Sequence, residues 1–217
     1  MHPTLKGAVY VTALFIGSEI IYQIYRKYKR KSKHRKENES KSRLSKSSLQ
    51  VLFFPDKDVA CRDYFISGDG CFKSNCQFSH SKTSLSELCK HMMSSQRSLD
   101  VCVFVITCRD LADILLKLHR RGVKIRIITD KGMLHTDGSQ IWTLQKEGIA
   151  VRTNNSSFFM HHKFAIKDQQ VLINGSFNWT RQAITGNQEN VLITDDLAVT
   201  SQFMAEFQKL WEHFDTS

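Results

Sequence analysis

HHKFAIKDQQVLINGSFN, which spans residues 161–178, is the stretch from which the rest of the 217-residue chain can be interpreted. Six of its residues stand at fixed spacing: His161, Lys163, Asp168, Gly175, Ser176 and Asn178. Side chains alternate along a strand, so His161 and Lys163 should point to the same face. A histidine that attacks phosphorus or donates a proton, beside a lysine that neutralises phosphate oxygens, suits cleavage of a phosphate ester.

Two short strands, 164–166 and 171–174, are expected within this stretch, with a turn at residues 167–170 between them. Gly175 and Ser176 end the second strand, where the backbone and a hydroxyl group can approach a phosphate closely. A further strand is expected at residues 188–194.

Strand and helix patterns alternate through the rest of the domain. Apolar, β-branched runs predict strands at residues 51–54, 99–107, 123–129 and 149–152. Helical spacing of apolar residues predicts helices at residues 84–96, 108–121, 137–147 and 197–214. Ser84 with Glu87, and Thr107 with Asp110, have the spacing of capping boxes. This alternation indicates an α/β domain in which helices cover a sheet.

The six spaced positions match the HKD signature, and residues 50–214 resemble the phospholipase D superfamily. The resemblance implies a mixed sheet flanked by helices. It also implies that His161 is the nucleophile, forming a covalent phosphohistidine, and that Lys163 and Asn178 grip the phosphate with Ser176 as a further contact. No metal is needed for this chemistry, because lysines stabilise the charge instead.

Two acidic residues have roles that remain open. Asp168 occupies the acidic position of the signature, and it either takes part in the chemistry or fixes the turn. Glu189 resembles the residue that orients the nucleophile's imidazole in the small bacterial nucleases of the superfamily. The alternative for Glu189 is an ordinary exposed glutamate on a strand.

The complete signature occurs once in the chain. The superfamily's chemistry needs two histidines, one as nucleophile and one as the acid that protonates the leaving oxygen. A chain with one copy must therefore obtain the second from another chain. This predicts a two-fold homodimer in which the two His161 residues converge at the interface.

A possible zinc site precedes the first expected helix. Its residues are Cys61, Cys71, Cys76 and His80, in the spacing Cys-x9-Cys-x4-Cys-x3-His. Three thiolates and an imidazole fit a closed tetrahedral zinc site, and the last two spacings resemble CCCH-type fingers. The prediction is a structural zinc within an insertion at residues 61–80. Unrelated buried thiols are the alternative, and RNA binding by the insertion is left open.

The N-terminus separates into three segments. After a tail at residues 1–7, residues 8–25 hold 18 residues with one charge, Glu19, which predicts a transmembrane signal anchor. A signal peptide and a buried helix are the alternatives. Residues 26–50 form a basic, flexible linker with 11 Lys/Arg and two Glu, so it carries +9 of the net +10. By the positive-inside rule, the catalytic domain at residues 51–217 lies in the cytosol.

An anchor, a basic linker, a CCCH insertion and one HKD copy together resemble the mitochondrial branch of the superfamily. That resemblance implies the outer mitochondrial membrane, with the N-terminus in the intermembrane space. It implies two activities, which are cleavage of single-stranded RNA in the piRNA pathway and hydrolysis of cardiolipin to phosphatidic acid, which promotes mitochondrial fusion. A membrane-tethered RNA-binding scaffold is the non-enzymatic alternative.

RNA is the favoured substrate at this point. Four basic residues are expected near strand ends, where they could line a cleft: Arg109, Lys131, Arg152 and Arg181. No long apolar loop in the sequence suggests a cleft for acyl chains.

Overall fold

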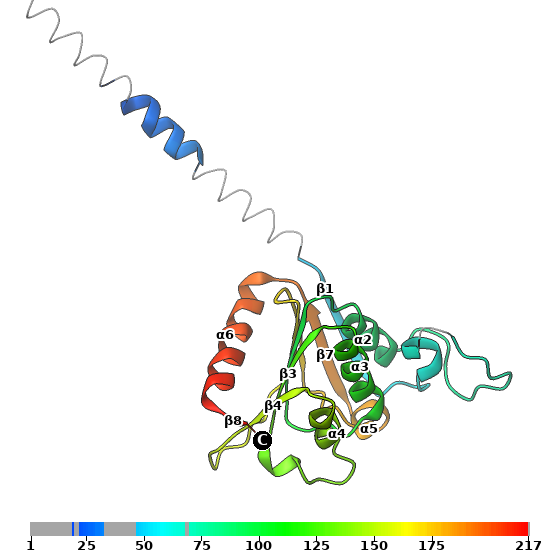
Figure 1. Ribbon diagram of the computed structural model, residues 1–217. Coiled ribbons are helices and arrows are strands. Elements are labelled where there is room, and N and C mark those ends of the chain that lie inside the picture. Colours follow the sequence, from blue (N-terminus) through cyan, green and yellow to red (C-terminus); the bar gives the residue numbers. More distant parts are fainter. Residues whose placement is uncertain (1–18, 20–21, 33–46, 68–69, 217) are drawn as a thin grey trace, which may run out of the picture. The chain divides into compact units, whose positions relative to one another are not determined.

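The computed structural model describes residues 19, 22–32, 47–67 and 70–216, in two units that comprise Met1–Ser47 and Ser48–Ser217. Within the first unit, residues 22–32 form a helix (Figure 1). The side chains of these residues are exposed. Residues 26–32 of the predicted basic linker belong to this helix, a conformation that lysine and arginine favour. The described helices include none that is both long and apolar enough to cross a membrane. Most of the predicted anchor, and residues 33–46, lie outside the described residues.

The second unit is built on one eight-stranded sheet, which is mixed as predicted. The strands are β1 (Leu49–Phe54), β2 (Ser98–Val103), β3 (Lys124–Thr129), β4 (Ala150–Thr153), β5 (Lys163–Lys167), β6 (Val171–Gly175), β7 (Glu189–Thr194) and β8 (Asp215–Thr216). Their spatial order is β1-β7-β6-β5-β2-β3-β4-β8. Only the β2–β3 and β3–β4 pairs are parallel. Strand β8 was not predicted, because two residues carry no periodic signal.

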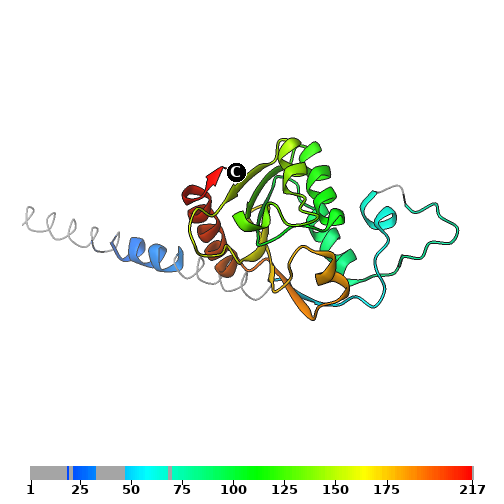
Figure 2. The same ribbon diagram turned by 90° about the horizontal axis from the view of Figure 1, so that it is seen from below.

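Helices cover both faces of this sheet, as Figures 1 and 2 show. They are α2 (Ser84–Met93), α3 (Arg109–Arg120), α4 (Ile141–Lys146), α5 (Arg181–Thr185) and α6 (Leu197–His213). The larger core lies under α2 to α5 and contains Leu88, Leu111 and Ile184. The smaller core lies under α6 and contains Phe164 and Phe207. The unit is thus a three-layer α/β domain.

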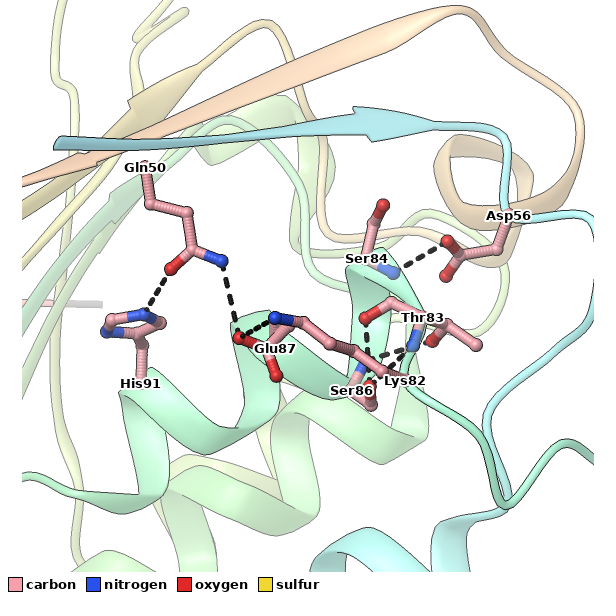
Figure 3. Close-up of polar contacts among 8 residues, drawn as sticks. All are labelled: Gln50, Asp56, Lys82, Thr83, Ser84, Ser86, Glu87 and His91. Carbon is pink, nitrogen blue, oxygen red and sulfur yellow. Dashed lines mark hydrogen bonds and ion pairs between the residues drawn. The ribbon is translucent and has the colours of Figure 1, made fainter.

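The start of α2 differs from its predicted capping box. Thr83 is the N-cap, and it exchanges hydrogen bonds with Ser86 in a reciprocal box (Figure 3). The carboxylate of Asp56 accepts hydrogen bonds from the first two backbone N–H groups of the helix, including that of Ser84 at 2.8 Å. The box predicted for Ser84 and Glu87 is wrong by one residue. Thr83 and Asp56 between them satisfy the donors that open the helix.

The start of α3 is held by backbone bonds instead of a capping box. Its N-cap is Cys108, which makes no side-chain cap. The backbone N–H groups of Thr107 and Cys108 both donate to the carbonyl of Trp179, each at 2.9 Å. The second predicted capping box is therefore wrong, and the strand predicted for residues 99–107 ends at Val103 because the chain leaves the sheet to meet Trp179.

Candidate active site

The predicted phosphate-binding residues come together at one edge of the sheet. Val103 at the end of β2 pairs with Lys163 at the start of β5. Asn174, near the end of β6, pairs with Phe164, the second residue of β5. The segment 176–178, which follows β6, therefore leaves the sheet at the edge where His161 and Lys163 enter it. We call this the active edge.

His161 and Lys163 are in direct contact. The ammonium nitrogen of Lys163 lies 3.2 Å from Nδ1 and 3.3 Å from Nε2 of the His161 ring, and it donates to the His161 carbonyl at 2.9 Å. Phe104 supports both side chains. Its ring lies edge-to-face with His161 at 4.7 Å between centroids, and Lys163 Nζ is 5.6 Å from the Phe104 centroid. Phe104 was not predicted as a site residue, because it lies inside a long apolar run.

Burial lowers the pKa of Lys163, while the negative charge of Glu189 opposes that shift. Lys163 is therefore partly removed from solvent and is influenced by the charge of a carboxylate. A desolvated cation interacts more strongly with a bound phosphate than one in bulk water does.

His162, the rival histidine, points elsewhere. Its ring packs edge-to-face on Phe164, which belongs to the core under α6. Burial lowers the pKa of His162, with the charge of Glu206 opposing it. The choice of His161 as the partner of Lys163, made from their spacing, therefore agrees with the geometry.

Glu189 and Ser176 form one hydrogen-bonded unit. The Ser176 hydroxyl donates to a Glu189 carboxylate oxygen and accepts from the backbone N–H of Asn190 at 3.1 Å. The other carboxylate oxygen accepts from the side chain of Asn187 at 2.9 Å. The hydrogen bonds that the structure gives Glu189 thus go to Ser176 and Asn187, so its orienting of the imidazole remains a prediction. Asn187 was not anticipated.

Gly175 has a different reason to be glycine from the one expected. A Cβ atom at this position would collide with the backbone carbonyl of Asn190 on β7. The close approach is therefore between two strands, and it seats Ser176 against Glu189.

Asn178 carries an unsatisfied group at the active edge. Its Oδ1 atom is buried and has no hydrogen-bond partner among the described residues. Buried polar atoms are nearly always paired, so an orphan of this kind is one that a ligand could satisfy. A 180° flip of the side-chain amide would present its NH2 group as a donor instead.

Asp168 lies far from these residues. It follows β5 at the opposite end, roughly 20 Å from His161 at the rise of an extended strand. Its carboxylate accepts from the backbone N–H groups of Gln96, Arg97 and Ser98, at 2.7–3.2 Å. Burial would raise the pKa of Asp168, but these hydrogen bonds outweigh it and hold the pKa below its usual value. The geometry supports the second of its two predicted roles, which is to fix the turn.

One of the four basic residues expected to line a cleft is engaged elsewhere. Arg152 donates to the carbonyl of Trp211 and lies over the Trp211 ring at 4.7 Å. Arg109, Lys131 and Arg181 are exposed, although Arg181 also lies 3.8 Å from the carboxylate of Asp110.

A groove adjoins His161 that the sequence did not predict. Its volume is ≈ 370 Å³. It is lined by Ser156, Phe158, Phe159, Met160, the two histidines, Leu210 of α6 and Phe214, which directly follows α6. We call it the aromatic groove. Its signal in the sequence was the pair Phe158-Phe159, which directly precedes the HKD stretch.

The four predicted zinc ligands are brought together. One ligand atom from each of Cys61, Cys71, Cys76 and His80 lies within 4.8 Å of all the others. The sulfur atoms of Cys61 and Cys76 are 3.6 Å apart, close to the roughly 3.8 Å between two thiolates bound tetrahedrally at 2.3 Å. A hydrogen bond from the backbone of Phe78 lowers the pKa of Cys76 to about 7. The donor set therefore fits a structural zinc.

This fold, with a histidine and a lysine paired at one sheet edge, defines a phosphodiesterase of the phospholipase D superfamily. The family model described as "Cardiolipin synthase, PLD-like domain" matches residues 88–211. Two solved structures resemble the chain, each 22% identical and each covering 79% of it. They are the phospholipase D family member Nuc from Salmonella typhimurium (TM-score 0.61, 99% of that chain) and NucT from Helicobacter pylori (TM-score 0.60, 100% of that chain).

Three relatives are named mitochondrial cardiolipin hydrolase. The protein of Chlamydomonas reinhardtii is 47% identical over 166 residues, 76% of this chain and 74% of the relative. That of Xenopus laevis is 43% identical over 173 residues, 80% and 81% respectively. That of Homo sapiens is 39% identical over 181 residues, 81% and 71% respectively. The chain belongs to the mitochondrial phospholipase D family, also called Zucchini.

Proposed function

We propose that the chain hydrolyses phosphodiesters through a phosphohistidine on His161, with no metal ion in the chemistry. The contact between Lys163 and both ring nitrogens of His161 carries this proposal. Whichever ring nitrogen attacks phosphorus, the ammonium group of Lys163 lies beside the position that the phosphoryl oxygens will occupy. A fixed cation at that position stabilises the charge that develops in the transition state.

The reaction needs two proton transfers. A ring nitrogen of His161 attacks phosphorus, the bond from phosphorus to the leaving oxygen breaks, and a second histidine gives that oxygen a proton. Water then attacks the phosphohistidine, the phosphorus–nitrogen bond breaks, and the second histidine takes a proton from the water. Since the complete signature occurs once, the second histidine is His161 of another copy, and the enzyme is a homodimer with a shared site.

Mixing experiments test the shared site. Wild-type and His161→Asn chains, combined in equal amounts and allowed to exchange, should show about a quarter of the wild-type activity, because only dimers of two wild-type chains are complete. About half of the activity would mean independent sites and would contradict the proposal. A mixture of His161→Asn and Lys163→Ala chains should also be inactive.

The substrate that we propose first is an anionic phospholipid such as cardiolipin, cleaved to phosphatidic acid. The order of preference from the sequence is reversed for two reasons. Arg152 is held against Trp211, which removes one of the four cations expected in a basic RNA cleft. An apolar groove adjoins His161, which supplies the feature that the sequence did not suggest. The names of the relatives support the same choice.

Cleavage of single-stranded RNA, as in piRNA precursor processing, is the second candidate. The exposed side chains of Phe158 and Phe159 favour it, because aromatic rings beside a phosphate site can stack on bases. Arg109 and Lys131 remain exposed for contacts with the RNA backbone. The same His161 and Lys163 chemistry would serve both substrates.

The location that we propose is the outer mitochondrial membrane, with a single-pass anchor at residues 8–25 and the catalytic domain in the cytosol. The relatives' names support mitochondria, and the basic run after the anchor supports the orientation. Anionic lipid would be attracted to that run.

One comparison distinguishes these functions. Full-length dimer and its His161→Asn variant are assayed on cardiolipin vesicles and on single-stranded RNA, with chelator present. Cleavage of lipid that depends on His161 is expected. Cleavage of RNA alone would reject the lipid proposal, and cleavage of neither, with RNA still bound, would favour the scaffold.

A further inference from the structure

We propose that the aromatic groove is a binding subsite for a hydrocarbon chain attached to the phosphodiester that His161 attacks. This inference rests on the proposed function, because it assumes that the phosphate sits at His161 and Lys163. It goes further by naming the part of the chain that recognises the substrate's apolar portion.

The two phenylalanines of the groove are held out in solvent by a braced loop. Phe158 is 81% exposed and Phe159 is 74% exposed. The buried side chain of Asn154 donates to the carbonyl of Phe158 at 2.8 Å and accepts from the backbone N–H of Lys131 at 2.8 Å. The buried carboxylate of Asp130 accepts from the backbone N–H of Met160 at 2.9 Å. These bonds hold the backbone of a loop that exposes two large apolar rings to water, an unfavourable exposure that a bound apolar partner would relieve.

The opposite wall is apolar as well. Leu210 and Phe214 from the end of α6 face the loop across the groove. Both pack against the core under α6, which contains Phe207. The groove is therefore an open extension of that core, and its walls have fixed positions on a helix and a braced loop.

The charge along the groove is distributed as a phospholipid would require. Its described lining residues include no lysine or arginine. Positive charge comes from Lys163, which contacts His161 at one end, and from Lys209 on α6, whose charge helps to lower the pKa of His162. A nucleic acid carries a phosphate at every residue and would need cations along its path. A phospholipid has its phosphate at one end and hydrocarbon beyond, which matches a charged end that continues into an apolar groove.

Paired soluble substrates test the subsite, and every variant is assayed in the same nanodiscs so that partitioning of the octyl ester into lipid is equal for all of them. The full chain in phosphatidylcholine nanodiscs is given methyl 4-nitrophenyl phosphate or octyl 4-nitrophenyl phosphate, and release of 4-nitrophenolate is followed. Each buried methylene strengthens binding about fourfold, so even partial burial should raise kcat/KM for the octyl ester at least about tenfold above the methyl ester.

Phe158→Ser should reduce that preference to roughly threefold or less, since it removes one apolar wall. The matched control is Phe72→Ser, which removes an equally exposed phenylalanine, 88% exposed, from the zinc-binding insertion. This control should keep the full preference for the octyl ester.

Several outcomes would overturn the subsite. The wild type could treat both esters equally, or Phe158→Ser could lower both together and leave the ratio intact. Sedimentation could show that Phe158→Ser abolishes the dimer, which would assign the groove to the second copy. If Phe158→Ser slowed cleavage of RNA as strongly as it slowed hydrolysis of the octyl ester, the two phenylalanines would be assigned to base stacking. If the wild type hydrolysed neither ester, the proposed function itself would fail.

Discussion

Lys163 and His161 are two residues apart in sequence, and the ammonium group of Lys163 lies within 3.3 Å of both nitrogens of the His161 ring. Such a contact brings a cation against a nucleophile that must first be uncharged. The arrangement is useful once a phosphoryl group with negative oxygens arrives between them. The same contact explains why His161 and Lys163 must lie on the same face of the extended chain. His162, between them, points the other way and packs toward α6.

Replacing this cation should remove most of the catalysis. We expect Lys163→Met to lower kcat on methyl 4-nitrophenyl phosphate by about 10²–10³, the usual effect of deleting one group that stabilises developing charge. The control is Lys167→Met, at the far end of the same strand, where the ammonium group bonds Ser94 instead. A loss below about tenfold for Lys163→Met would contradict the role of this lysine.

Asp168 should act on stability and not on chemistry. Asp168→Asn weakens three backbone hydrogen bonds, and we expect it to lower the free energy of unfolding by about 2–4 kcal/mol at pH 7. Activity per folded molecule should stay within about threefold of the wild type. Exposed Asp137→Asn serves as the control. If Asp168→Asn protein were folded but inactive, Asp168 would have to take part in the chemistry.

The pH dependence of that difference follows from the lowered pKa of Asp168. A depressed carboxyl pKa contributes stability above the unfolded pKa, near 3.9, and the contribution is lost as pH falls through the folded pKa. Denaturant unfolding of the wild type and Asp168→Asn should therefore differ most at neutral pH. The two should converge as pH falls below about 4. If the difference in free energy of unfolding between the two proteins instead grew at low pH, folding would raise the pKa of Asp168 and not lower it.

Metal analysis tests the zinc site apart from the chemistry. We expect one zinc per chain in the wild type, and loss of zinc with reduced thermal stability in Cys76→Ser. Gln77→Ser, at the next residue, should keep its zinc. Hydrolysis of the methyl ester should survive in Cys76→Ser at temperatures where it remains folded. Zinc-dependent turnover in protein that is still folded would argue against metal-free catalysis.

Substitution of Gly175 tests the close approach of β6 to β7 that brings Ser176 to Glu189. Gly175→Ala should destabilise the domain by about 3 kcal/mol or more, because its Cβ atom meets the rigid carbonyl of Asn190. Gly186→Ala is the control, since its Cβ atom would meet only the flexible side chain of Gln182. Equal stability of the two variants, measured by denaturant unfolding, would mean that β6 and β7 can separate at no cost.

Much of the fold was predictable because its elements are periodic. The apolar run before Val103 and the stripe through Leu111 and Leu115 mark a buried strand and the helix that covers it. The order of strands was not predictable, because pairing of β5 with β2 joins segments some 60 residues apart. Strand β8 and helix α5 are too short to leave a pattern.

The site was predictable where the chemistry is local in sequence, as with His161 and Lys163. It was less predictable where the role depends on a distant partner. The fate of Arg152 is decided by Trp211 on α6, and the exposure of Phe158 by Asn154 and its backbone bonds. Spacing alone cannot distinguish a free arginine from one that is held against a helix.

The separation of His161 from Asp168 along β5 changes how damaged copies of such a sequence should be classified. The letters of the signature do not all report the same property. A chain that has lost its histidine has lost the reaction and can keep its frame. We expect a chain that has lost its aspartate to keep the reaction in a less stable domain, so we propose that it be counted as a fragile enzyme and not as a pseudoenzyme.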